Sequence, residues 1–320
     1  MKNFVARYLR ERAGGLAAYR AQTRAEGQSG SVRLLNWWPG NDSRREWFRK
    51  FVLNRGIGKS VDICSLFGPR SVLGWSKADI RIFFSGENLH LARWSHYADY
   101  MLSGPTPFDL GLGFDYFEDE HYLRFPLWLT YMFPPESTEE DIRRICGELR
   151  HPSGNSGSKY CSLISRWDPS GVRGRIFEAL RPFGEISCPS GFMHNDDSLV
   201  GKFGDDKAEY LKQFRFNICP ENSNADGYTT EKIFESISAG CIPVYSGSFG
   251  RPEPEVLDPE AILTWKDGGD NSDTISIVRE LESNRRAYEE FASRPRLVAG
   301  AEEWVLGKFE ELGKRLDGAD

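Results

Sequence analysis

A glutamate and a lysine at the start of one predicted helix are the residues whose types and spacing most suggest chemistry. Thr229 or Thr230 is expected to cap this helix, so the side chains of Glu231 and Lys232 fall in its first turn. The free N–H groups and partial positive charge of a helix start suit a phosphate group. The helix dipole disfavours a cation there by about 0.3–1 kcal/mol, and a ligand anion would offset this cost. The alternative is a lysine whose ammonium extends into solvent.

The elements around this helix form a βαβ pattern. A strand is predicted over 214–219, a polar loop over 220–227, and a second strand over 241–245 after Gly240 ends the helix. Open parallel sheets bind ligands beyond the carboxyl ends of their strands, where such helices begin. The pattern therefore predicts a ligand site at the start of the helix that carries Lys232.

The same stretch resembles the conserved motif of the α1,3-fucosyltransferases. That motif has the form F-x-x-x-x-E-N, then a short polar loop, Y-x-T-E-K and P-V-x-x-G. The residues that fill it here are Phe216, Glu221, Asn222, Tyr228, Thr230, Glu231, Lys232, Pro243, Val244 and Gly247. Segments of the first half, among them NWW at 36–38, RIFFSGEN at 81–88 and YLRFP at 122–126, are similar to bacterial members of the family.

The resemblance implies an α/β protein with the GT-B fold, in which two Rossmann-like domains face each other across a cleft. It also implies an inverting glycosyltransferase that moves L-fucose from GDP-β-L-fucose to a glycan hydroxyl, with α1,3 linkage to GlcNAc expected. Two alternatives are the same fold with another nucleotide sugar, and an inactive glycan-binding module. Glu87, Glu231 and Lys232 argue against the inactive module, because pure binding needs neither a base nor a phosphate cation.

Glu87 is the expected general base. It follows the apolar run 80–84 in a Gly-Glu-Asn loop, where the family places its catalytic glutamate. Outside such a motif, a glutamate is more often an exposed loop carboxylate. An inverting transfer also needs a group that stabilises the departing diphosphate, and the resemblance assigns this role to Lys232. Glu231 matches the position used against the fucose ring, where a carboxylate favours the positive charge that develops at the anomeric carbon.

Asn222 and Tyr228 correspond to nucleotide contacts in the family, and the alternatives for them are an Asx turn and a core aromatic. One departure concerns the diphosphate. The family usually has an arginine in the loop after the strand predicted at 186–188, and this loop contains none here. His194 and Lys202 are the nearest basic replacements, although neither offers the bidentate fork of arginine.

Acceptor choice is expected to depend on the loop 89–107 of the first half. Trp94, His96 and Tyr97 could stack on sugar rings there, and the same aromatics could equally pack a helix. The expected partners are GDP-fucose and an oligosaccharide or glycoconjugate acceptor. No metal and no cofactor is expected, because a lysine and a helix dipole can neutralise a diphosphate.

Length and composition predict how the chain is divided into domains. A chain of 320 residues suggests two domains, and the Gly- and Ser-rich segment 151–159 is the clearest linker. We therefore predict an N-terminal extension, an acceptor-binding Rossmann-like domain, a GDP-fucose-binding Rossmann-like domain and a C-terminal helix. Their boundaries are 1–30, 31–150, 151–295 and 296–320.

The charge and cysteine content indicate the compartment. A formal net charge of −6 argues against a protein held mainly by nucleic acid. None of the six cysteines forms a CxxC pair, and no segment reaches ~18 consecutive apolar residues. We expect a cytoplasmic protein with buried thiols. The basic residues of 1–30 leave open a peripheral contact with the inner face of the membrane.

Overall fold

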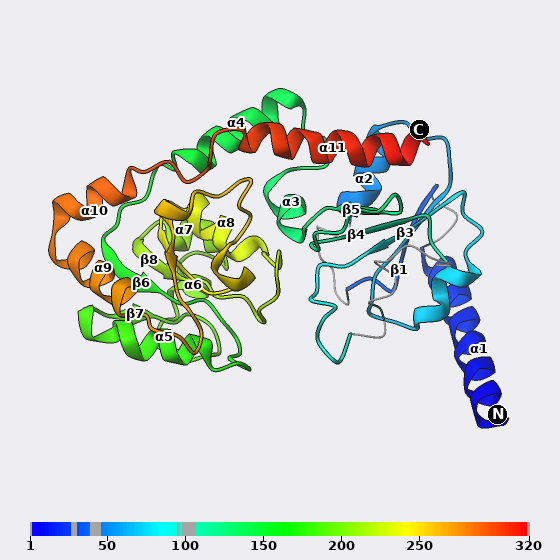
Figure 1. Ribbon diagram of the computed structural model, residues 1–320, viewed down its shortest axis with the longest axis horizontal. Coiled ribbons are helices and arrows are strands. Elements are labelled where there is room, and N and C mark those ends of the chain that lie inside the picture. The colour runs from blue at the N-terminus through cyan, green and yellow to red at the C-terminus, as the bar shows by residue number, and fades with distance from the viewer. Residues whose placement is uncertain (1, 27–30, 39–45, 95–96, 98–106, 319–320) are drawn as a thin grey trace. The chain divides into compact units, whose positions relative to one another are not determined.

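The computed structural model describes residues 2–26, 31–38, 46–94, 97 and 107–318 of the chain. The chain divides into two compact units (Figure 1). The first unit comprises Met1–Thr138 together with Leu306–Asp320, and the second comprises Glu139–Val305. Each unit contains one five-stranded sheet, so the α/β class expected from the sequence is confirmed.

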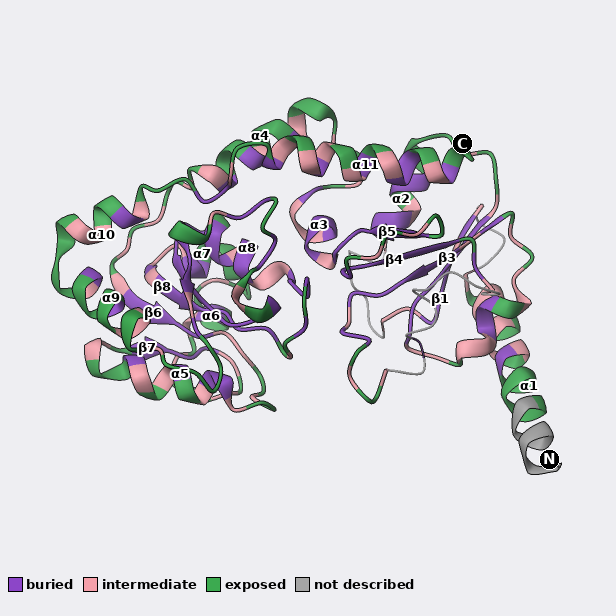
Figure 2. Ribbon diagram, viewed as in Figure 1, coloured by how far each residue is buried: buried purple, intermediate pink, exposed green. Residues whose placement is uncertain are grey.

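The first unit has a parallel sheet with the strand order β1-β2-β3-β4-β5. Nearly all of the strand residues are buried, as Figure 2 shows. Parallel strands covered on both faces read as continuous apolar runs, which is why IRIFF was recognisable as a strand. The strands are β1 (Val32–Leu35), β2 (Val61–Cys64), β3 (Ile80–Phe84), β4 (Leu110–Gly113) and β5 (Tyr122–Arg124). The sheet is accompanied by helices α2 (Trp47–Asn54) and α3 (Leu127–Met132).

The N-terminal residues form a long helix that packs on the first unit. Helix α1 (Lys2–Ala25) passes so close to the 3-10 helix η2 (Arg70–Trp75) that a Cβ on Gly15 would lie 2.1 Å from a side-chain atom of η2. Gln22 exchanges two hydrogen bonds with Asn36, with lengths of 3.0 and 2.7 Å. The sequence predicted an N-terminal extension over 1–30, and in the structure most of that segment is this helix, which contacts the first unit.

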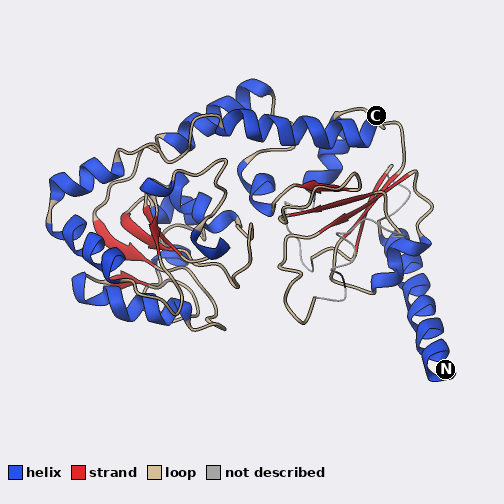
Figure 3. Ribbon diagram, in the orientation of Figure 1, coloured by secondary structure: helices blue, strands red, loops and turns tan. Residues whose placement is uncertain are grey.

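The second unit has a parallel sheet with the strand order β10-β9-β8-β6-β7, flanked by helices (Figure 3). From β6 the chain adds β7 on one side, and then β8, β9 and β10 on the other. The order thus reverses between β6 and β8, and such a switch point is where open α/β sheets bind ligands. The strands are β6 (Lys159–Ser162), β7 (Ile186–Ser187), β8 (Phe214–Ile218), β9 (Ile242–Tyr245) and β10 (Leu263–Thr264).

Two apolar clusters accompany this sheet. One joins buried residues of β6, β8 and β9 to helices α5 and α9, and the other joins α7 to the start of β8. The helices of this unit are α4 (Glu139–Arg150), α5 (Val172–Leu180), α6 (Ser198–Gly201), α7 (Lys207–Leu211), α8 (Glu231–Ser238), α9 (Ser272–Ser283) and α10 (Arg285–Ala292). The last helix, α11 (Ala301–Asp317), is divided between the two units.

The division of the chain lies earlier than the linker that we predicted. It falls between Thr138 and Glu139, so α4 belongs to the second unit, whereas the sequence suggested a boundary after residue 150. The reason is that Arg150, at the end of α4, is tied to this unit. Its guanidinium lies 2.5 Å from the Glu302 carboxylate and donates to the Val298 carbonyl at 3.0 Å.

The segment 151–159 is fixed at its centre by Asn155. The side-chain amide donates to the carbonyls of Phe214 and Ala239 at 3.0 and 2.8 Å, and its oxygen accepts from the Gly157 N–H. The Gly- and Ser-rich segment 151–159 is therefore not a free linker. Through Asn155 it is hydrogen-bonded to the start of β8 and to the residue after α8.

All six cysteines are free and buried. Burial disfavours the thiolate, and it raises the pKa of Cys188 to about 11. The expectation of buried thiols is confirmed by this arrangement.

Asn155 yields a stability prediction. Asn155→Ala removes these three hydrogen bonds, each worth about 0.5–1.5 kcal/mol, and we expect the free energy of unfolding to fall by about 1.5–4.5 kcal/mol. Urea denaturation followed by circular dichroism measures this change. Ser153→Ala, at an exposed position of the same segment, should stay within about 0.5 kcal/mol of the parent. Equal losses in both variants would mean that Asn155 is not an anchor.

Candidate functional site

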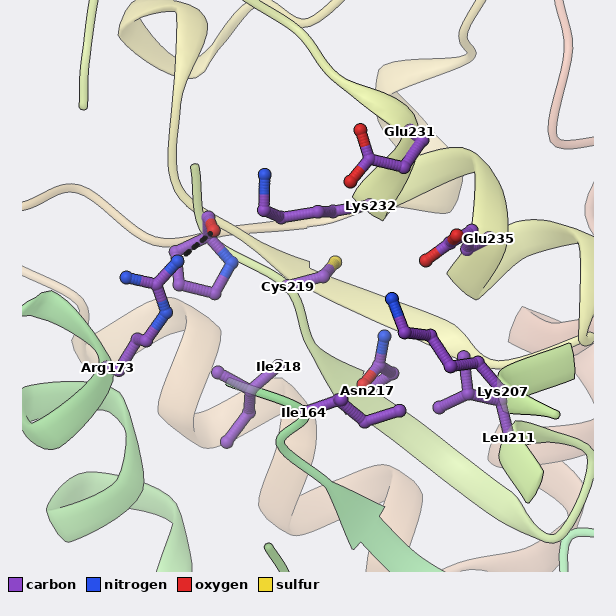
Figure 4. A pocket seen from close by; sticks show the side chains of 11 residues that line it. Ile164, Arg173, Lys207, Leu211, Asn217, Ile218, Cys219, Glu231, Lys232 and Glu235 are labelled. Carbon is purple, nitrogen blue, oxygen red and sulfur yellow. Dashed lines mark hydrogen bonds between the residues drawn. The ribbon is translucent and has the colours of Figure 1, made fainter. Parts of the chain in front are cut away.

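A pocket of about 80 Å³ lies at the switch point of the second sheet, where helices α5 and α8 begin (Figure 4). It combines an apolar floor with five charged side chains from three helices. The lining residues are Ile164, Arg173, Lys207, Leu211, Asn217, Ile218, Cys219, Pro220, Glu231, Lys232 and Glu235. The ligand site predicted at the start of α8 therefore coincides with a cavity.

The buried carboxylate of Glu221 organises the start of α8. It accepts hydrogen bonds from the Thr230 N–H and hydroxyl, both at 2.7 Å, and from the Lys232 ammonium at 2.9 Å. Glu221 is only 2% exposed, so these donors replace the water that the carboxylate loses. Gly247 packs against it, because a Cβ there would lie 2.7 Å from the Glu221 side chain. The Glu and Gly of the sequence motif thus meet in one packed arrangement.

Glu221 also explains how a cation is tolerated in the first turn of α8. We expected a ligand anion to offset the helix dipole at Lys232, and the protein already supplies an anion of its own. Burial alone would lower the pKa of Lys232, but the carboxylates of Glu221 and Glu231 outweigh it and raise that pKa. Lys232 is therefore a firmly protonated ammonium. Its side chain remains 24% exposed and lines the pocket.

Arg173 is the site residue that sequence reasoning missed. Its Nη2 donates to the carbonyl of Pro220 at 3.1 Å and to the side-chain oxygen of Asn222 at 2.9 Å. Its Nη1 is buried without a hydrogen-bond partner in the described structure, and the nearest carboxylate oxygen, from Asp168, lies 4.0 Å away. Burial lowers the pKa of this guanidinium, against the opposing effects of Asp168 and Glu221. An orphaned cationic N–H of this kind suits an anionic ligand.

The start of α5 holds Arg173 in place. Asp168 accepts hydrogen bonds from the backbone N–H groups of Arg173 and Gly174, at 3.2 and 2.9 Å. Gly171 precedes the helix with a φ of +72°, a conformation that glycine adopts without strain. Figure 4 shows the Arg173 guanidinium and the Lys232 ammonium on the same side of the pocket, with Glu231 beside Lys232. The pattern D-P-S-G-V-R was the available signal, since it marks an arginine in a first helical turn.

The two basic residues proposed to replace the missing arginine lie elsewhere. His194 pairs with the exposed Asp197 at 3.0 Å, and the Lys202 ammonium lies 5.0 Å from the ring centre of Phe203. Neither side chain lines the pocket. The cation beside Lys232 comes instead from Arg173, on the helix after β6 rather than in the loop after β7.

The remaining donor-site candidates are divided between the pocket and the core. Glu231 is the first residue of α8 and lines the pocket. Asn222 is exposed next to Arg173, whose guanidinium it accepts from. Tyr228 is only 3% exposed, and its carbonyl accepts from the Ser248 hydroxyl. The phenol of Tyr228 is thus a buried aromatic of the loop, the alternative that the sequence left open for it.

Glu87 lies at the carboxyl end of β3 in the first unit, as the sequence suggested. Ser85 and Glu87 form a tight turn, in which the Ser85 hydroxyl donates to the Glu87 carbonyl at 2.9 Å. Gly86 has no room for a side chain, since a Cβ would lie 2.9 Å from a methyl group of Leu127. The Glu87 side chain is 25% exposed, and one carboxylate oxygen lies 3.8 Å from the Arg93 guanidinium. A partly exposed carboxylate on a rigid turn suits proton transfer.

Two of the three aromatics proposed for acceptor stacking, Trp94 and Tyr97, pack against the first core. Tyr97 is fully buried, stacks on Phe83 at a centroid distance of 5.7 Å and donates to the Gly68 carbonyl at 2.5 Å. Its ring therefore offers no face to a sugar. Trp94 is half-buried with its edge toward Phe67, and His96 lies outside the described residues. Packing of the first core, which the sequence left as the alternative, accounts for Tyr97.

Among the described residues, no group of three or more His, Cys, Asp or Glu side chains could hold a metal ion. None of the described helices is long and apolar enough to cross a membrane.

Two family models match this chain. The C-terminal model of glycosyltransferase family 10 (fucosyltransferase) matches residues 155–296, and the alpha-(1,3)-fucosyltransferase FucT N-terminal domain matches residues 32–131. Together they cover most of the chain.

The chain belongs to glycosyltransferase family 10.

Curated relatives agree with this assignment. This family 10 chain is 23% identical to alpha-(1,3)-fucosyltransferase FucT of Helicobacter pylori in an alignment 301 positions long, which covers 80% of this chain and 58% of that protein. It is also 23% identical over 130 residues to 4-galactosyl-N-acetylglucosaminide 3-alpha-L-fucosyltransferase 9 of Homo sapiens, covering 40% of this chain and 34% of the human protein. The matches thus span less than two thirds of either relative.

Solved structures share the fold. A crystal structure of an alpha1,3-fucosyltransferase superposes with a TM-score of 0.60 at 18% identity, covering 90% of both chains. A second, with GDP-fucose, gives 0.55 at 18% identity, covering 94% of this chain and 97% of the other. The GT-B class with two Rossmann-like domains, expected from the sequence, is confirmed.

The Glu221–Lys232 pair yields the prediction of this section. Removing one partner of a fully buried ion pair costs about 3–5 kcal/mol. Lys232 is partly exposed, so we expect Glu221→Gln to lower the free energy of unfolding by about 2–3 kcal/mol, again measured in urea. Glu255→Gln, at an exposed carboxylate, should have almost no effect.

The difference between wild type and Glu221→Gln should also depend on pH. Because the folded protein raises the pKa of Lys232, the ion pair stabilises fully below the ordinary lysine pKa of about 10.4. Its contribution is lost only as pH rises through the still higher folded value. A difference in stability that vanished between pH 6 and pH 9 would contradict this assignment.

Proposed function

We propose that this protein is an inverting α1,3-fucosyltransferase that moves L-fucose from GDP-β-L-fucose to a hydroxyl of GlcNAc in a glycan. The observation that carries the proposal is the pair Arg173 and Lys232, two cations at one pocket on a switch point of a family 10 chain. The first unit would bind the acceptor and the second would bind the donor.

The leaving group in this proposal is GDP, whose diphosphate gains charge as the bond to the sugar breaks. The pKa of the Lys232 ammonium is raised, so this group remains protonated and would pair with an oxygen of the diphosphate. Arg173 offers its unpartnered Nη1, and the first N–H groups of α8 add the field of the helix dipole. With these charges the reaction needs no metal ion, and activity should therefore survive excess EDTA.

The base in this proposal is Glu87. As the acceptor oxygen attacks the anomeric carbon, its proton passes to the Glu87 carboxylate, and the bond to the diphosphate breaks on the opposite face. This in-line displacement inverts the anomeric configuration. Glu231, the first residue of α8, would stabilise the positive charge that develops on the sugar ring. The partial exposure of Glu87 and its tight turn support its role as the base.

Two alternatives have distinct experimental outcomes. An enzyme for another nucleotide sugar would release its nucleoside diphosphate from that donor faster than from GDP-fucose. An inactive glycan-binding module would release it from none, although it would bind a glycan. The protein is placed in the cytoplasm by this proposal, and its six buried, free thiols support a reducing compartment.

Arg173 yields a test of the donor site. Arg173→Ala removes the orphaned N–H and one positive charge, so we expect GDP to bind at least tenfold more weakly, a change of about 1.4 kcal/mol. Arg173→Lys keeps the positive charge but not the planar fork, so its affinity for GDP should lie between those of wild type and Arg173→Ala. Calorimetry with GDP measures all three proteins. Lys202→Ala serves as the control, because its ammonium lies outside the pocket and its loss should leave the affinity unchanged.

Glu87 yields a test of the base. Glu87→Gln keeps the size of the side chain but cannot accept a proton, so we expect kcat to fall by about 10²–10⁴-fold. The affinity for GDP should change less than twofold, since the donor contacts belong to the second unit. Rates are measured from the release of GDP in the presence of N-acetyllactosamine. Near-normal turnover by this variant would move the base to another residue.

A further inference from the structure

A second cavity, of about 150 Å³, lies in the first unit and is lined mainly by aromatic side chains. Trp37 and Trp38 follow β1, and Phe84 ends β3, so the cavity lies at the carboxyl edge of the first sheet. Leu127 and Tyr131 of α3 contribute to its lining. The motif NWW of the sequence is therefore part of a pocket that the roles described so far do not use.

This cavity adjoins the turn that carries the proposed base. Phe84 immediately precedes the Ser85–Glu87 turn, and it is one wall of the cavity. Leu127 is another wall, and Gly86 passes so close to it that a Cβ would lie 2.9 Å from one of its methyl groups. A molecule in the cavity would thus lie next to the backbone that holds Glu87.

The two indole rings are fixed before any ligand arrives. Trp37 stacks on Phe84 with an interplanar angle of 23° and a centroid distance of 5.9 Å. Trp38 packs against Phe67 at 5.0 Å and meets Trp37 edge-on at 5.1 Å. Both indoles nevertheless remain partly exposed. Aromatic rings held in this way lose little conformational entropy on binding, which is what a recognition surface requires.

The lining selects a neutral ligand. None of the residues that line the cavity in the described structure is charged, in contrast to the five charged side chains at the pocket of the second unit. A diphosphate therefore has no counter-charge here. A pyranose ring has an apolar face of C–H groups that can stack on an indole, and hydroxyls at its rim that can bond to Thr130 or Tyr131.

We infer that this cavity is the acceptor subsite, in which Trp38 and Trp37 stack on a neutral pyranose ring of the glycan beside Glu87. This inference rests on the proposed function, because the base must face the hydroxyl that it deprotonates. It replaces Trp94 and Tyr97 as the stacking residues, since Tyr97 is fully buried and Trp94 packs against the core.

The test separates acceptor binding from donor binding. We expect Trp38→Ala to raise the KM for N-acetyllactosamine at least tenfold, while the KM for GDP-fucose changes less than twofold. Trp38→Phe keeps an aromatic face, so its KM for N-acetyllactosamine should lie close to that of wild type. Trp167→Ala is the matched control, since this indole is 72% exposed in the second unit and should matter to neither KM. An unchanged acceptor KM in folded Trp38→Ala would overturn the inference.

A direct binding measurement makes the result independent of turnover. Saturation-transfer NMR with N-acetyllactosamine should show contact with wild type and with Trp167→Ala, and little contact with Trp38→Ala. If wild type binds the disaccharide but does not turn over GDP-fucose, the proposed function fails while the subsite stands. Equal contact in all three proteins overturns the subsite alone. Tyr131→Ala provides a second variant of the same cavity, with the same expected loss, should Trp38→Ala not fold.

Discussion

The structure of the pocket at the start of α8 depends on one buried anion. The Glu221 carboxylate accepts hydrogen bonds from the N–H and hydroxyl of Thr230 and from the ammonium of Lys232. It has almost no access to water. A buried carboxylate without partners would cost several kcal/mol, so the loop after β8 and the start of α8 are stable only together. The position of Lys232 is thus a consequence of where Glu221 is buried.

This arrangement also sets the electrostatics of the pocket. Glu221 already balances the charge of Lys232, so Arg173 is the cation whose Nη1 is left without a hydrogen-bond partner in the described structure. The pocket is also lined by Lys207, Glu231 and Glu235, so the unpartnered Nη1 of Arg173, rather than an excess of positive charge, is what would favour an anion. A donor diphosphate would add its charge to a site whose geometry is already in place, which is the condition for strong electrostatic stabilisation.

The sequence revealed those features that depend on local pattern. Apolar runs such as 80–84 and 214–218 predicted buried strands, and the motif around Glu231 and Lys232 predicted which helix start would line a pocket. The turn at Glu87 followed from the same logic, since a buried strand and a Gly-Glu-Asn loop define it locally.

What the sequence could not reveal depends on contacts between distant segments. Arg173 reaches Pro220 and Asn222 across 47 and 49 residues, and nothing in its neighbourhood marks it as their partner. The sequence left open whether Tyr97 stacks on a sugar or packs in the core, because its burial depends on the distant Phe83 and Gly68. Likewise, α4 joined the second unit because Arg150 meets Glu302. Side-chain pairing over such separations has no periodicity to detect.

The six buried thiols have a practical consequence for fluorescence labelling of this protein in solution. Maleimide reagents attack thiolates, and burial in this protein both shields each sulfur and disfavours its ionisation. A cysteine introduced at an exposed position of either unit would therefore carry a fluorophore selectively, without removal of the native cysteines. Two such dyes, one on each unit, would report by energy transfer how the separation of the units changes when nucleotide is added.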